Sequence, residues 1–206
     1  MQTNNSNNSI SDINFDADSG SARETSNEQL MVDYSRGQTE AFAMLYQRNK
    51  AGLYRYFLRQ TNNSAIAEEF AQDVWTKLIQ SAHRYKPTAK FSTFLYQIAH
   101  NRFVDHIRRQ QIRPVDSSQN SLDTIDIIDN GKPPPEEQLR QSRLETLLKS
   151  LLYDLPQQQR EAFLLKEEGG LSLNEIAYVT GCNTETVKSR LRYANRKLRS
   201  GLGDLI

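Results

Sequence analysis

The sequence FSTFLYQIAHNRFVDHIRR, residues 91–109, combines a helical apolar period with many basic and aromatic side chains. The hydroxyl of Ser92 or Thr93 can cap the start of this helix, because either can accept a hydrogen bond from a free backbone N–H of the first turn. Positions at steps of three and four predict one buried face, formed by Phe94, Ile98, Asn101, Val104 and Ile107. The side chains expected on the exposed side are Tyr96, His100, Arg102, Arg108 and Arg109.

The charge of this region is strongly positive. From His83 to Arg113 the chain carries seven Lys or Arg against one acid, Asp105, a surplus of six. Basic side chains bind phosphates and aromatic rings stack on unpaired bases, so the pattern is typical of a surface that binds a nucleic-acid strand. A solvated basic helix face has the same composition, and this segment alone leaves both interpretations open.

Charge is also segregated along the whole chain. Its 206 residues allow one or two domains, and the net charge of +1 hides two acidic stretches. Residues 1–35 and residues 116–137 each carry six acids and one base. The basic surplus therefore lies in 83–113 and again in 188–199, which suggests two basic modules with an acidic spacer between them.

Cysteine content and hydropathy bear on the compartment. Cys182 is the single cysteine, so no intramolecular disulfide can form, and we expect it to be a packing residue rather than a nucleophile. No apolar run approaches the roughly 18–20 residues of a membrane span. The start of the chain, MQTNNSNNSISD, lacks the features of a secretion signal. We expect a cytoplasmic protein with no membrane insertion.

The first half of the chain reads as a disordered tail followed by helices. Residues 1–27 contain scattered apolar residues without a period, which favours disorder. Helices are predicted over about 40–60 and 65–81, the second capped by Ser64, and with 91–111 they can form a bundle.

The second helix exposes an acidic cluster. Acids near a helix start are stabilised by the helix dipole, but Asp73 lies too deep for that, so a basic protein partner is the alternative.

The second half predicts a linker and a helix-turn-helix. Residues 112–137 hold four of the six prolines and read as a flexible linker, followed by helices over about 137–153 and 157–168. Ser172-Leu-Asn-Glu175 is a capping box, and after the turn at Gly181 a final helix runs from Asn183 or Thr184 to about 199. Its buried stripe is Val187, Leu191, Ala194 and Leu198. A short capped helix, a glycine turn and a longer helix with a basic outer face is an arrangement that binds the DNA major groove. The predicted fold class is all-α, with two small helical domains.

Four motifs carry a resemblance to a known family. They are Ala67-Glu68-Glu69 through Gln72-Asp73-Val74-Trp75; residues 91–101 with Asp105 and Arg108-Arg109; Leu155-Pro156 with Arg160-Glu161-Ala162-Phe163; and residues 171–177 with Thr186-Val-Lys-Ser-Arg-Leu191. With these motifs the chain resembles, from about Glu40 to Leu202, a bacterial RNA polymerase sigma factor of the extracytoplasmic-function class of the sigma-70 family. The resemblance implies region 2 over residues 28–113, a linker over 114–137 and region 4 over 138–206, after a tail over 1–27.

The resemblance also implies partners and roles. It implies a transcription initiation factor that directs core RNA polymerase to promoters and assists melting, as an alternative, stress- or envelope-responsive sigma factor. Core polymerase would be contacted at the β′ clamp helices and the β flap, and an anti-sigma factor is common in this class. The acidic linker would run through the polymerase interior. In region 2 a base of the −10 element would leave the stack and enter a small pocket.

The resemblance assigns three sets of residues. The polymerase-binding set is Glu68, Glu69, Gln72, Asp73 and Trp75. The −10 set is Tyr85, Lys86, Lys90, Phe91, Ser92, Thr93, Tyr96, His100, Asn101, Arg102, Arg108 and Arg109. The −35 set is Thr184, Glu185, Thr186, Lys188, Ser189, Arg190, Arg192, Tyr193, Arg196 and Lys197. The chain departs from the family at Phe94, where Trp is common, and at Pro87, where Gly is frequent; Pro87 puts the preferred −10 sequence in doubt.

Two other classes of function are considered. A one-component regulator shares this type of helix-turn-helix, but it would need an upstream sensor domain with strands, where this chain predicts helices. An enzyme could use His83, His100, His106 and Asp105, yet His100 and His106 point in different directions on one helix. No phosphate-binding glycine loop or cysteine pair accompanies them. We therefore expect no catalytic residues, no metal site and no cofactor.

Overall fold

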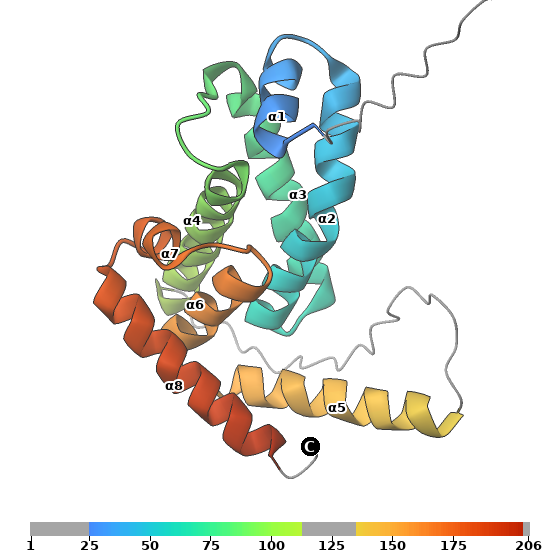
Figure 1. Ribbon diagram of the computed structural model, residues 1–206, viewed down its shortest axis with the longest axis vertical. Coiled ribbons are helices and arrows are strands. Elements are labelled where there is room, and N and C mark those ends of the chain that lie inside the picture. The colour runs from blue at the N-terminus through green and yellow to red at the C-terminus, as the bar shows by residue number, and fades with distance from the viewer. Residues whose placement is uncertain (1–24, 113–134, 204–206) are drawn as a thin grey trace, which may run out of the picture.

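A computed structural model of the chain describes residues 25–112 and 135–203. Its elements are α1 (Asn27–Ser35), α2 (Thr39–Thr61), α3 (Ser64–Ser81), the 3-10 turn η1 (Ala82–Arg84), α4 (Phe91–Ile112), α5 (Pro135–Tyr153), α6 (Gln157–Glu167), α7 (Leu173–Thr180) and α8 (Thr184–Leu202) (Figure 1). No strand occurs within the described ranges, which confirms the predicted all-α class. The strand-containing sensor that a one-component regulator would need is thus not found in residues 25–112.

Two predicted segments fall mainly outside the described part of the chain. Of the predicted tail, 1–27, the structure describes residues 25–27. Of the predicted linker, 114–137, it describes residues 135–137, which form the first turn of α5. The described helices include none that is long and apolar enough to cross a membrane.

Helices α1–α4 form one unit around an aromatic core. Phe57 of α2 and Phe70 of α3 are fully buried, and their rings meet edge to face with centroids 5.5 Å apart. Leu45, Leu53 and Leu78 have no exposed surface. Burying such side chains stabilises a fold by about 1.5–3 kcal/mol each, so this core holds α2 and α3 together.

Helix α1 is not predicted by the sequence pattern, and it determines how α4 begins. Ser26 caps α1 by accepting from the backbone N–H of Gln29 at 3.2 Å. The carboxylate of Glu28 then accepts the backbone N–H of Phe91 at 2.7 Å. The predicted cap by Ser92 or Thr93 is wrong, because α4 begins at Phe91 and both hydroxyls lie inside the first turn.

Two further details of the helix ends and faces differ from prediction. Helix α3 is capped by Asn63, which accepts from Ile66 N–H at 3.0 Å, and not by Ser64. The fully buried residues of α4 are Phe91, Leu95, Ala99 and Phe103, at steps of four. The predicted stripe is wrong: Asn101 is exposed, and the other four positions are half-buried. The reason is that α4 is covered on two sides, so its apolar positions do not define a single buried face.

Helices α5–α8 form the second unit, and here the local predictions hold. Both hydrogen bonds of the Ser172–Glu175 capping box are present. Gly181 has the left-handed φ of 64° that ends α7, and Asn183 caps α8 through Thr186 N–H at 2.7 Å. Val187, Leu191, Ala194 and Leu198 are buried, which confirms the predicted stripe of α8.

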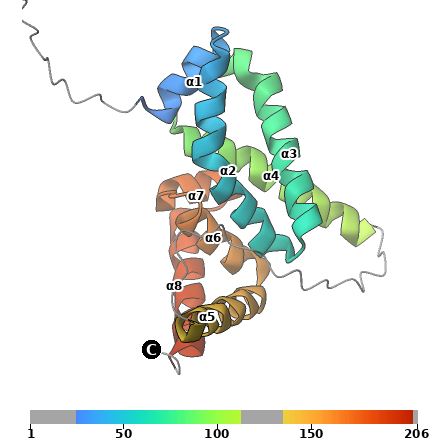
Figure 2. The ribbon, with the colours of Figure 1, turned by 90° about the vertical axis from the view of Figure 1, so that its right-hand side faces the viewer.

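The two units pack against each other. Helices α6 and α7 lie between the first unit and α8, in contact with α2 and α4 (Figures 1 and 2). A continuous apolar core runs from α1–α4 into Leu164, Leu165 and Ile176 of the second unit. Helix α8 lies on the far side of α6 and α7, and so its outer surface faces away from the first unit.

Candidate nucleic-acid interface

The outer surface of α8 is basic and exposed. Lys188, Arg192 and Arg196 are all exposed, and the guanidinium groups of the two arginines lie 5.6 and 5.0 Å from the ring centre of Tyr193. Lys188 is held by Glu185 at 2.7 Å. Farther along the helix, a hollow of about 550 Å³ is lined by Arg192, Asn195, Arg196, Arg199 and Ser200. A helix of this kind can place side chains on base edges and on phosphates at the same time.

Two residues of the predicted −35 set are hydrogen-bonded to other parts of their own unit. Arg190 donates to Oε1 of Gln158 on α6 at 2.7 Å. The ammonium group of Lys197 donates to the backbone oxygen of Asp154 at 2.5 Å. These contacts tie α8 to its own unit, while Thr184, Thr186 and Ser189 are half-buried near its start. In this conformation the outward set is therefore smaller than the predicted one.

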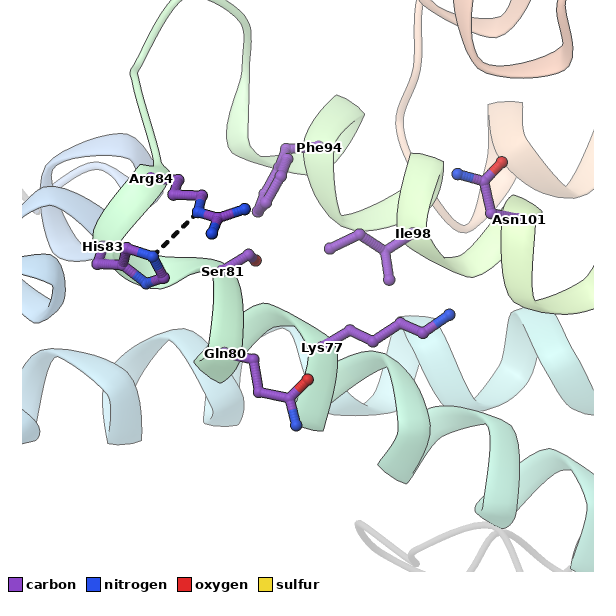
Figure 3. A pocket seen from close by; sticks show the side chains of 8 residues that line it. All are labelled: Lys77, Gln80, Ser81, His83, Arg84, Phe94, Ile98 and Asn101. Carbon is purple, nitrogen blue, oxygen red and sulfur yellow. Dashed lines mark hydrogen bonds between the residues drawn. The ribbon is translucent and has the colours of Figure 1, made fainter.

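A second surface lies between α3, η1 and α4. A hollow of about 430 Å³ opens there, lined by Lys77, Gln80, Ser81, His83, Arg84, Phe94, Ile98 and Asn101 (Figure 3). Phe94 and Ile98 supply apolar surface, while Lys77, Arg84 and Asn101 supply donors and, from the amide of Asn101, an acceptor. Of these residues only Asn101 is in the predicted −10 set. Lys77, on the helix predicted over 65–81, and Arg84, one of the seven basic residues between His83 and Arg113, were missed.

The loop beside this hollow keeps its basic side chains exposed. Lys86 and Lys90 are exposed, as are Arg108 and Arg109 at the far end of α4. Tyr85 packs on Phe94, with ring centres 5.3 Å apart, and burial raises the pKa of its phenol. The Tyr85 hydroxyl is buried and has no hydrogen-bond partner among the described residues. Tyr85 therefore packs against Phe94, one of the residues that line the hollow.

Four other members of the predicted −10 set are covered by protein, three of them by the second unit. Phe91, Thr93 and Tyr96 are buried, and His100 is half-buried. The hydroxyl of Tyr96 donates to the backbone oxygen of Glu168 at 2.9 Å, and burial raises the pKa of this phenol. In the packed arrangement Thr93, Tyr96 and His100 therefore contact residues of the second unit.

Arg102 links two of the predicted sets. Its guanidinium contacts Asp73 at 2.6 Å and Glu69 at 2.8 Å, and lies 3.8 Å from the ring centre of Phe70. Burial and the nearby Arg102 charge lower the pKa of His106, whose ring packs against Phe70. A residue predicted to hold DNA is thus paired with acids predicted to hold polymerase.

The predicted polymerase-binding set is split between surface and core. Glu68, Glu69 and Gln72 are exposed and Asp73 is half-buried on α3. Trp75 is only 7% exposed and packs edge-on against Phe42 and Tyr46. Trp75 therefore supports the acidic surface from inside.

The three histidines each have a different partner. His83 contacts Arg84, His100 contacts Glu161 and His106 contacts Phe70. Within residues 25–112 and 135–203 no three His, Cys, Asp or Glu side chains are placed to hold a metal ion. Cys182 is half-buried beside Thr180, in a packing position.

Comparisons with known proteins agree with this two-unit organisation. The family model for sigma-70 region 2 matches residues 45–112, and the model for sigma-70 region 4 matches residues 146–198. The chain belongs to the extracytoplasmic-function class of the sigma-70 family. Region 2 thus coincides with most of α2 and with α3 and α4, and region 4 with the last part of α5, with α6 and α7, and with most of α8.

Among similar sigma factors is RNA polymerase sigma-H factor of Pseudomonas aeruginosa, 27% identical over 87% of this chain and 95% of its own length. ECF RNA polymerase sigma factor SigE of Mycolicibacterium smegmatis is 30% identical over 77% of this chain and 60% of its own length. The SigW factor of Bacillus subtilis is 28% identical over 82% of this chain and 93% of its own length.

Solved structures share the fold. CnrH in complex with the cytosolic domain of CnrY matches with a TM-score of 0.61 at 19% identity, covering 87% of this chain and 99% of that chain. The sigma factor RpoE of Bartonella quintana, solved with the anti-sigma factor NepR, matches with a TM-score of 0.62 at 21% identity, covering 79% and 96%.

Proposed function

We propose that this sigma factor directs core RNA polymerase to promoters through two separate readers, the outer surface of α8 and the hollow between α3, η1 and α4. The observation that carries the proposal is that both surfaces occur in one chain and differ in chemistry. The outer face of α8 is one side of a helix with exposed basic side chains, which suits the major groove of a duplex. The other surface is a hollow with apolar and polar walls, which suits one unpaired base.

In this proposal the α8 surface binds the −35 element as a duplex. Lys188 and Arg192 would contact base edges, and Arg196 would contact phosphates. Tyr193 between the two arginines would keep their guanidinium groups spread. A good bidentate contact discriminates between bases by about 1–3 kcal/mol.

The hollow beside α4 would receive a base of the −10 element after the strands separate. Pockets of about 300–1,000 Å³ commonly hold whole small ligands, so the volume of about 430 Å³ leaves room for one base. Phe94 would contact the base face, while Asn101 would donate to and accept from its edge. Lys77 and Arg84 would neutralise the flanking phosphates, because both are basic residues that line the hollow.

The exposed acids of α3 would bind core polymerase, and an anti-sigma factor is a further partner that the family suggests. We propose that the chain acts by positioning and melting DNA, without a catalytic site of its own. This agrees with its basic surfaces and with the separate placement of its histidines.

The test is a footprint on promoter DNA with purified core polymerase and this chain. Protection at both elements is expected from the holoenzyme, and weak protection from either component alone. Arg192→Ala should reduce protection of the −35 element, and Asn101→Ala protection and melting of the −10 element. Lys166→Ala, an exposed cation on α6, is the matched control. Equal loss at both elements from either variant would count against two independent readers.

A further inference from the structure

Helix α1 lies outside both segments that match the sigma-70 models, since the region 2 match begins at residue 45. It is nevertheless fixed to the first unit. Leu30 and Met31 are buried in the core. The guanidinium of Arg48 on α2 donates to the backbone oxygen of Thr25 at 2.6 Å and to Oδ1 of Asn27 at 3.3 Å. The start of α1 therefore has a defined position relative to α2.

Glu28 of this helix caps α4 from a distance in sequence. Its Oε1 accepts the backbone N–H of Phe91, the first residue of α4, at 2.7 Å. The first backbone N–H groups of a helix have no partner within the helix, and the residue just before the helix usually supplies one. Here that residue is Lys90, whose ammonium can only donate. Glu28, 63 positions earlier, therefore supplies the acceptor that the Lys90 side chain cannot.

The charge of Glu28 strengthens this cap. Burial would raise its pKa, but hydrogen bonds from the Phe91 N–H and from Ser26 and the nearby charge of Lys90 lower it overall. A negative charge at the start of a helix is also stabilised by the helix dipole. Glu28 is therefore ionised at neutral pH and holds the start of α4 by its charge as well as by its hydrogen bond.

The same helix holds both ends of the loop formed by residues 85–90. This loop has no regular secondary structure and joins η1 to α4, and α1 contacts both of these elements (Figure 1). Tyr85, the first residue of the loop, lies near Glu28, because burial and then the charge of Glu28 raise the pKa of its phenol. The last residue of the loop, Lys90, precedes the capped Phe91. Both ends of the loop therefore rest on α1.

The two ends of the loop are also two sides of the hollow that is proposed to receive an unpaired base. Arg84 of η1 lies before the loop, and Phe94 and Asn101 of α4 lie after it (Figure 3). Phe94 follows Phe91 by one helical turn, so a shift at the start of α4 would move it. A binding site must be held within about 0.5 Å of its working geometry by supporting contacts. Glu28 supplies such a contact, although it is not among the residues that line the hollow.

We propose that Glu28 is a positioning residue for −10 recognition: by capping α4 it holds the loop 85–90 and Phe94 in the arrangement in which the hollow accepts a base. This inference rests on the proposed function, because it takes the hollow as the site of the unpaired −10 base. A loop that is already ordered loses less conformational entropy when the base binds. Pro87 acts in the same direction, because its ring fixes one φ of the loop.

The first measurement is hydrogen exchange by mass spectrometry on the full chain. Glu28→Ala removes the acceptor, whereas Glu28→Gln keeps an amide oxygen that can accept the Phe91 N–H. Residues 86–94 should exchange about fivefold faster in Glu28→Ala, the effect of a lost helix cap. In Glu28→Gln they should exchange within about twofold of wild type, because a neutral hydrogen bond replaces a charged one. Exchange in α8 should be unchanged in both variants.

Glu40→Ala is the matched control. Glu40 is an exposed acid in the first turn of α2, and its removal changes the net charge of the chain by the same amount. Exchange of residues 86–94 should be the same in Glu40→Ala as in wild type. Equal exchange of this segment in Glu28→Ala and wild type would overturn the proposal at this stage, because Glu28 would then not hold the loop.

The second measurement uses holoenzyme, reconstituted with core polymerase, on a genomic promoter fragment that the wild-type holoenzyme melts. Permanganate reactivity of unpaired thymines reports melting of the −10 element, and a nuclease footprint reports the −35 element. Glu28→Ala should lower melting by about fivefold and leave −35 protection unchanged, because fewer molecules hold the hollow in its binding arrangement. Glu28→Gln should recover most of the melting. A cap that only stabilised the fold would lower both signals by the same factor, and that result, or wild-type melting by Glu28→Ala, would overturn the proposal.

Asn101→Ala, measured beside these variants, separates this inference from the proposed function. Asn101 lines the hollow and is the residue proposed to bind the edge of the base. If Asn101→Ala leaves melting intact, the proposed function of the hollow fails, while hydrogen exchange still decides whether Glu28 holds the loop. If Asn101→Ala impairs melting and Glu28→Ala does not, the proposed function stands and the role of Glu28 alone is rejected.

Discussion

Replacing Trp75 tests whether this residue contacts polymerase or supports the surface that does. Its side chain is 7% exposed, and its ring meets Phe42 at 5.9 Å and Tyr46 at 5.1 Å between centroids. Truncating a buried Trp to Ala costs about 3–5 kcal/mol of folding free energy. Each of the two ring contacts accounts for about 0.5–1.5 kcal/mol beyond area burial. Since small domains are stable by about 5–15 kcal/mol, Trp75→Ala should remove a large part of that margin.

Trp75→Phe is the informative companion, because it keeps an aromatic ring in the cluster. We expect it to lose less than half of what Trp75→Ala loses, and to retain binding to the β′ clamp helices. The assay is urea unfolding followed by circular dichroism, with polymerase binding measured under conditions where each variant is folded. The reasoning is refuted if Trp75→Ala unfolds at the wild-type urea concentration but no longer binds polymerase, since Trp75 would then be a direct contact.

Three further predictions concern the pH response and the two DNA and polymerase surfaces. Burial alone would raise the pKa of Glu175, but hydrogen bonds from Ser172 and Thr93 and the Lys90 charge lower it from 4.5 to about 2. The Glu175 carboxylate therefore contributes fully to the free energy of unfolding above about pH 4.5, and this contribution is lost as the pH falls towards 2. Glu175→Gln should abolish this pH-dependent loss in urea melts. Lys188→Ala and Arg192→Ala should each weaken binding of −35 duplex by about 1–3 kcal/mol if these residues contact bases. If they contact phosphates instead, each substitution should weaken binding equally for all sequences and lower the salt dependence of binding, which titrations at several salt concentrations would reveal. Glu69→Lys with Asp73→Lys should abolish co-purification with β′ while helicity is retained, and unchanged co-purification would reject this surface as the polymerase contact.

The second unit was predicted well because its signals are local. The Ser172–Glu175 capping box, the turn at Gly181 and the stripe from Val187 to Leu198 are each fixed by residues within one or two turns. Such features depend on backbone hydrogen bonds and on a single buried face, and a sequence period reports both. The outward basic face of α8 follows directly from that stripe.

The first unit was predicted less well because its decisive contacts are distant in sequence. The start of α4 is held by Glu28, which lies in a helix too short and too weakly periodic to stand out. The buried face of α4 was assigned to the wrong positions, because one side packs on α3 and the other on region 4. The partners of Glu161 likewise lie on α2 and α4, and no local pattern indicates them.

The placement of Arg102 adds a functional link that composition could not indicate. A basic residue in a basic helix predicts a DNA contact, yet here it is held by Glu69 and Asp73 of α3. Binding of polymerase to these acids would therefore change the partners of a residue in the −10 set.

The central claim is that this chain selects start sites for core RNA polymerase through two surfaces. The most direct measurement is in vitro transcription of genomic DNA by purified core polymerase with and without the chain, with RNA 5′ ends mapped. Discrete start sites that need the chain, preceded by two shared sequence elements, are the predicted result. Start sites that are the same with and without the chain would contradict the account.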